Sequence, residues 1–100
     1  MSRRKIMQKE ERQLQDLISV GPSIAEDFGR LGIRSVAQLA RQDPRKLYER
    51  LCRAKGERID VCCLDAFTAA VAQARDPLLP AEKCQWWYWS RLRKARDARK

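Results

Sequence analysis

The chain of 100 residues contains no histidine and no long apolar stretch. Without histidine, it lacks the side chain that enzymes use most often as a general base. Charged residues or prolines break every apolar run well short of the roughly 18 residues that a membrane-spanning helix requires. The basic start of the chain, residues 1–5, leads into further charged residues rather than an apolar segment, so it does not resemble a secretory signal. We therefore expect a cytoplasmic protein that does not contact a membrane.

Cysteine is present, but not in the paired spacing of a metal site. The four cysteines are Cys52, Cys62, Cys63 and Cys84. Zinc sites usually carry two cysteines separated by two to four residues, often with histidine, whereas Cys62 and Cys63 are adjacent. Without a secretory signal, reduced thiols that pack as small hydrophobes are expected, with structural zinc as the minor alternative. We predict no metal and no cofactor.

Sequence motifs of the common enzyme classes are also missing. No nucleophile elbow, phosphate-binding loop or dinucleotide fingerprint occurs. The carboxylates are scattered, and the adjacent pair Glu26 and Asp27 would point in different directions on a helix. We therefore predict no catalytic residues, no small-molecule substrate and no enzymatic activity. A fragment of a nuclease or glycosylase is the remaining enzymatic alternative, although the chain lacks the length and the acid–base set.

The net charge of +9 lies mostly at the two ends of the chain. Residues 1–12 carry five basic and two acidic side chains, and residues 91–100 carry six basic and one acidic. Within the middle, residues 13–29 hold three carboxylates and no base, whereas residues 30–58 hold nine bases and three carboxylates. A basic surface attracts nucleic acid, so the middle of the chain should offer one only in residues 30–58. Solvated helix faces are the alternative explanation for these bases.

The apolar spacing predicts an all-α fold, a single compact domain of five or six short helices. Residues 7–18 form the first predicted helix, and Gly21-Pro22 marks a tight connection to the second, which ends at Gly32. Ser35 and Asp43 are candidate caps of the next two helices, and Gly56 ends the latter. Asp60 is expected to cap a fifth helix that ends near Arg75. We place the helical domain at residues 7–92, between flexible basic segments at 1–6 and 93–100.

Two segments stand out by their apolar residues: the fifth predicted helix has the longest apolar pattern, and residues 86–89 have the largest apolar side chains. The fifth predicted helix is apolar nearly all round, which indicates either the central helix of the core or an oligomer interface; we favour the central position. Trp86, Trp87, Tyr88 and Trp89 lie near a last helix. Aromatic anchors of this kind close a core or a subunit contact, and stacking on single-stranded bases is the alternative role.

The connection around Gly21 has a chemical use. A tight turn before a helix aims backbone N–H groups outward, and the helix dipole helps them to bind an anion such as phosphate. Val20 would hold the turn to the core. We expect Gly21 to occupy a left-handed position, so that Gly21→Val would be damaging. Contacts to phosphate carry no base identity.

The segment Leu17–Ala25 resembles the helix-hairpin-helix motif of DNA-binding proteins. The continuation through 31–39 and 43–52, with the later 60–62 and 86–89 stretches, is similar to one small bacterial family, the pathogenicity locus family, some of whose members carry a mitomycin-resistance label. The resemblance covers roughly residues 14–89 and implies an all-helical fold and a DNA-related role. The chain departs from the motif at Ser19, where glycine is usual, and at Ser23, where many hairpins have a base. Asp16, Glu26 and Asp27 also make this hairpin a poor attractor of phosphate.

These observations predict a sequence-nonspecific, non-enzymatic DNA-binding module that contacts the phosphate backbone. The candidate nucleic-acid-binding residues are Ser19, Val20, Gly21, Ser23, Arg30, Arg34 and Arg45. The alternative is a protein–protein interaction or oligomerisation module, with a protein partner or a homodimer and no direct DNA binding.

Overall fold

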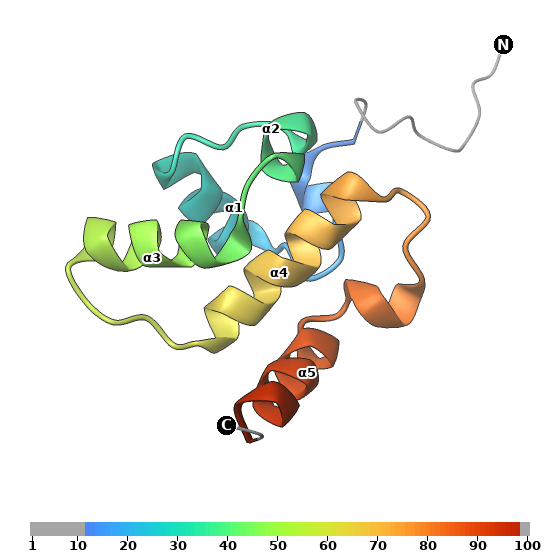
Figure 1. Ribbon diagram of the computed structural model, residues 1–100. Coiled ribbons are helices and arrows are strands. Elements are labelled where there is room, and N and C mark those ends of the chain that lie inside the picture. The colour runs from blue at the N-terminus through green and yellow to red at the C-terminus, as the bar shows by residue number, and fades with distance from the viewer. Residues whose placement is uncertain (1–11, 99–100) are drawn as a thin grey trace, which may run out of the picture.

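A computed structural model describes residues 12–98, and over this range the fold is all-α, as predicted, without a β-strand. Within these described residues, five α-helices and two short 3-10 helices form one globule (Figure 1). In chain order, they are η2 (Leu14–Asp16), α1 (Pro22–Arg30), α2 (Val36–Ala40), α3 (Pro44–Lys55), α4 (Cys62–Arg75), η3 (Ala81–Cys84) and α5 (Trp86–Ala98).

Local chemistry sets the ends of the middle helices, as expected. The Ser35 hydroxyl accepts a hydrogen bond from the amide of Gln38 at 3.1 Å, and the Asp43 carboxylate accepts one from the amide of Arg45 at 2.9 Å. Both caps satisfy donors that a helix start leaves without a partner. Gly32 and Gly56 have φ values of 82° and 68°, which glycine adopts without steric cost.

Helix α4 is the central helix of the core, as its apolar composition predicted. It contacts α2, α3, η3 and α5, and Figure 1 shows α3 and α5 on opposite sides of it. Phe67 of α4 is fully buried and lies 5.1 Å, centroid to centroid, from the buried ring of Phe28 in α1. Each such ring removes a large apolar area from water, so α4 links the first half of the chain to the second.

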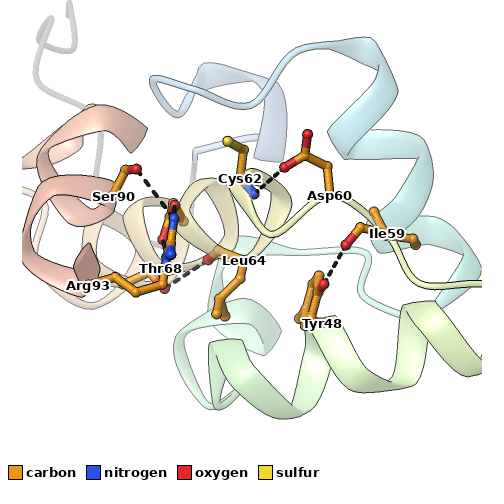
Figure 2. Close-up of polar contacts among 9 residues, drawn as sticks. Tyr48, Ile59, Asp60, Cys62, Leu64, Thr68, Ser90 and Arg93 are labelled. Carbon is orange, nitrogen blue, oxygen red and sulfur yellow. Dashed lines mark hydrogen bonds and ion pairs between the residues drawn. The ribbon is translucent and has the colours of Figure 1, made fainter. Parts of the chain in front are cut away.

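A buried ion pair fastens α5 to α4. The guanidinium of Arg93 donates two hydrogen bonds to the carboxylate of Asp65, at 2.9 and 2.8 Å, and Asp65 is only 2% exposed. This bidentate geometry is the strong form of the arginine–carboxylate pair, and it raises the pKa of Arg93. Figure 2 shows Arg93 and the buried Ser90 reaching from α5 towards α4. Two more contacts in this view hold the start of α4 and the preceding loop: Cys62 N–H to Asp60, and the Tyr48 hydroxyl to the Ile59 carbonyl.

Two predicted boundaries differ from the structure. The described part of the first predicted helix, residues 12–18, contains only the 3-10 turn η2 rather than an α-helix, and residues 7–11 lie outside the described residues. The last helix does not stop at residue 92 but continues to Ala98, and Arg93, just past the expected end, is anchored on Asp65 of α4. Of the two segments expected to be flexible, 1–6 and 93–100, residues 93–98 belong to α5, and residues 1–6 and 99–100 lie outside the described range. Within residues 12–98, no helix is long and apolar enough to cross a membrane.

Candidate functional site

The turn that leads into α1 has its left-handed residue at Ser19, not at Gly21. Ser19 has a φ of 75°, whereas Gly21 has an extended backbone with a φ of −90°. A Cβ added at Gly21 would meet no atom within 4 Å. The expectation that a side chain at Gly21 would be excluded is therefore wrong, because Gly21 has an extended backbone that any residue can adopt and space for a Cβ.

The side chain of Gln73 in α4 forms hydrogen bonds with the backbone of this turn. Its side-chain amide accepts a hydrogen bond from Ile18 N–H at 2.9 Å and donates one to the Ile18 carbonyl at 2.7 Å. The Gln73 side chain thus pairs with both backbone groups of one residue, as a neighbouring β-strand would. Arg12 donates to the carbonyls of Gln73 and Ala74 at 3.0 and 3.3 Å. The turn is a fixed part of the core surface, and its buried Val20 is 5% exposed.

The Ser19 hydroxyl joins the turn to the start of α5. It donates to the Cys84 carbonyl at 3.1 Å and accepts from Trp86 N–H at 3.2 Å. Cys84 and Trp86 lie 65 and 67 positions after Ser19 in the sequence, and both contact its side chain. The serine that stands in place of glycine has a structural role that sequence reasoning did not find.

The N-terminus of α1 is open to solvent. Gly21 is its N-cap residue, and no side chain caps the helix. Gly21, Pro22 and Ser23 are all exposed. The amides of Ser23 and Ile24, at the second and third positions, belong to the set that a helix start leaves without an intrahelical partner. Together with the helix dipole, they form a surface suited to an anion.

Part of the negative charge near this helix is already balanced. Asp27 is 8% exposed, and its carboxylate lies 3.6 Å from the Lys55 ammonium and 3.9 Å from the Arg30 guanidinium. Asp16 accepts a hydrogen bond from Gln13 N–H at 2.8 Å. Among the three nearby carboxylates, Glu26 alone has no hydrogen bond or ion pair of this kind within residues 12–98. The turn is thus less repulsive to phosphate than its sequence indicates.

The predicted basic residues do not gather at the turn. Arg34 lines a hollow with Ala25 of α1 and residues 13–15, which precede the turn. Arg30 is at the opposite end of α1, about 12 Å along the helix axis from Pro22, and it pairs with Asp27. Arg45 faces a different groove, between the start of α3, α4 and α5, with a volume of about 630 Å³.

Helix α5 supplies a second basic surface that the sequence analysis did not assign. Trp86 and Trp87 are 42% and 39% exposed, so these two rings do not close the core. They line a hollow of about 380 Å³ with Ser90, Arg91 and Lys94. The guanidinium of Arg91 lies 4.8 Å from the centroid of the Trp87 ring. The spacing of residues 87, 91 and 94, one helical face, is the signal that could have identified this surface.

The thiols of Cys62, Cys63 and Cys84 are poor nucleophiles at neutral pH. Burial raises the pKa of the Cys63 thiol to about 11, and burial also raises the pKa values of Cys62 and Cys84. Reactive cysteines show the opposite shift, because the thiolate is the nucleophile. Within residues 12–98, no group of three or more cysteine or carboxylate side chains could hold a metal ion.

Comparison with known proteins identifies the family. The model of the pathogenicity locus family matches residues 7–95. A relative from Streptomyces lavendulae, described as mitomycin resistance protein McrB, is 46% identical over 81 residues, which cover 81% of this chain and 73% of the relative. No solved structure matches the chain. The chain belongs to the pathogenicity locus family.

Proposed function

We propose that this protein is a sequence-nonspecific DNA-binding module that contacts the phosphate backbone. The turn at residues 17–21, followed by α1, would serve as the hairpin and second helix of a helix-hairpin-helix element. In this proposal, the amides at the start of α1 bind one phosphate, and Arg91 and Lys94 of α5 bind neighbouring phosphates.

The contact of Ser19 with residues 84 and 86 is the observation that carries the proposal. It holds Ser19, three residues before the uncapped start of α1, against the start of α5. Backbone amides and two cations can then act on one strand, which neither element offers alone. In this proposal Arg34, which lies against residues 13–15 and Ala25, adds a third cation.

The expected binding is nonspecific because the groups at this surface recognise phosphate. Amides, lysine and arginine on phosphate position a protein on DNA without reading its sequence. Affinity should therefore depend on the release of counterions and should fall steeply as the salt concentration rises.

Gly21→Asp is the most direct test. Aspartate is a better helix N-cap than glycine by a few tenths of a kcal/mol, and the position has room for it, so the fold should be kept. The carboxylate would occupy the free amides of α1 and repel phosphate. We expect about a fivefold loss of affinity for duplex DNA at low salt, with a salt slope shallower by about one.

Fluorescence anisotropy of a labelled duplex, titrated with the full chain at several salt concentrations, measures both quantities. Ala54→Asp, at an exposed position of α3, makes the same change in net charge away from the turn and serves as the control. Equal losses for the two variants would indicate a generic charge effect, and no duplex binding by the unsubstituted chain at low salt would refute the proposal.

A further inference from the structure

We propose that α5 carries a separate site for unpaired bases, so that the protein prefers DNA with a single-stranded segment. The site is the tryptophan face, defined as Trp86, Trp87, Arg91 and Lys94 around the hollow they line. The inference rests on the proposed function, which concerns contacts to phosphate, and it adds a contact to the bases.

The exposure of two neighbouring tryptophans is the first observation. Trp86 and Trp87 are about two-fifths exposed although the chain has a well-filled core, with Phe28 and Phe67 fully buried. Their neighbour Trp89 is held differently, since its indole N–H donates to the Lys83 carbonyl at 2.7 Å. Ser90 and Arg93 face α4. Side chains at positions 89, 90 and 93 therefore hold α5 to its neighbours, while parts of the Trp86 and Trp87 rings remain open to solvent.

The chemistry around the hollow suits a nucleotide. Arg91 lies 4.8 Å from the centroid of the Trp87 ring, an arrangement that stabilises a cation on one face of the ring. Aromatic rings interleaved with cations are what sequence-tolerant single-strand binders use, with bases stacked on the rings and phosphates on the cations. Residues 12–98 contribute no carboxylate to the lining of this hollow, so nothing there opposes a phosphate.

Continuity with the turn favours a strand that leaves the duplex at this point. The Trp86 amide donates to the Ser19 hydroxyl at 3.2 Å, so the tryptophan face begins where the turn ends. A strand with its phosphate at the start of α1 would reach Trp86 within the next nucleotides. There its bases could leave the helix stack and pack on the indoles.

A second copy of the chain is a less suitable occupant. A symmetric dimer places the same patch on both sides of its interface, so Arg91 and Lys94 of both chains would be brought into one interface. Each chain also carries a net charge of +9. Such like-charge contacts oppose association, whereas a polyanion neutralises them.

The test compares a labelled oligothymidylate with a blunt duplex of the same length, both titrated with the full chain. Trp87→Leu removes the stacking surface, Trp87→Phe keeps an aromatic ring, and Leu92→Ala changes an exposed apolar residue of α5 that does not line the hollow. We expect Trp87→Leu to weaken single-strand binding about tenfold or more and to change duplex binding less than twofold. Trp87→Phe should recover most of the loss, and Leu92→Ala should have no effect.

The same titration reports on the tryptophans directly, because stacked bases quench indole fluorescence. The proposal would be overturned if Trp87→Leu weakened single-strand and duplex binding equally, or weakened neither. It would also be overturned if sedimentation showed that the substitution converts a dimer to a monomer. The two proposals can fail separately. If duplex binding is absent while single-strand binding depends on Trp87, the proposed function fails and the tryptophan face stands; if Gly21→Asp weakens duplex binding and Trp87→Leu changes nothing, the reverse holds.

Discussion

Ser19 combines a left-handed backbone with two side-chain hydrogen bonds, and the two features have opposite effects on stability. Its φ of 75° is costly for a residue with a Cβ, whereas its hydroxyl bonds to Cys84 and Trp86. Ser19→Ala keeps the strain and loses both bonds, so we expect a loss of about 1–2 kcal/mol in the free energy of unfolding. Ser19→Gly also loses the bonds but relieves the strain, and its loss should be smaller. Urea denaturation measures both values; a more stable Ser19→Ala variant would contradict the assignment.

Cys63 should make stability depend on pH in the alkaline range. Burial, as the main cause, raises the pKa of its thiol from 9.0 to about 11 in the folded chain. The folded state therefore holds this proton more tightly than the unfolded state, so the contribution to stability is complete below pH 9 and is lost as the pH rises towards 11. The stability difference between the unsubstituted chain and Cys63→Ala should shrink between pH 8 and pH 10. A difference that stays constant across this range would show that the thiol is not desolvated.

At the scale of elements, the attachment of α5 depends on one buried pair. Removing Arg93 leaves the Asp65 carboxylate, 2% exposed, without its cation, and such losses typically cost about 3 kcal/mol or more. We expect Arg93→Met to lower the free energy of unfolding by about this amount and Lys94→Met, at the exposed neighbouring position, to change it little. Hydrogen exchange of the α5 amides should rise most. The double variant Asp65→Leu with Arg93→Met should recover much of the loss, since it leaves no buried charge.

The elements whose ends are set by neighbouring residues could be predicted from the sequence. Asp43-Pro44 begins α3, and Gly56 ends it with a φ of 68°, because caps and left-handed glycines act within one helical turn. The segment 12–18 has helical spacing, yet its backbone bends so that Ile18 can pair with Gln73, 55 residues away. The ordered position of Arg93 was missed for the same reason, because its partner Asp65 lies 28 residues away in the sequence.

The candidate site was harder to predict than the fold because it is assembled from distant segments. The turn and Gly21 were identified from local chemistry, and the structure places Gly21 at an open helix start. The bases nearest to the turn in sequence are not its neighbours in space: Arg30 pairs with Asp27, and Arg45 faces another groove. The hydrogen bond to the start of α5 comes from Ser19, a residue at which the chain departs from the usual motif.

For the whole molecule, the question is whether its excess charge acts as a general attraction or through one face. A polycation effect depends on net charge alone, whereas a localised site depends on where the charges lie. Arg91→Glu with Lys94→Glu reverses two charges on α5, and Lys46→Glu with Arg53→Glu makes the same change at exposed positions of α3, on the other side of α4 (Figure 1). Both double variants reduce the net charge from +9 by the same amount.

We expect the α5 variant to lower the salt slope of duplex binding by about two, one for each phosphate that the protein no longer binds, and the α3 variant to lower it far less. Circular dichroism melts would verify that both variants remain folded. Equal salt slopes for the two variants would mean that DNA does not bind preferentially to the α5 face. The bound phosphates would then be distributed over the whole basic surface. Unequal slopes would place the duplex across α5 and the start of α1, because long-range attraction is nearly the same for both variants and only direct interactions with phosphate differ.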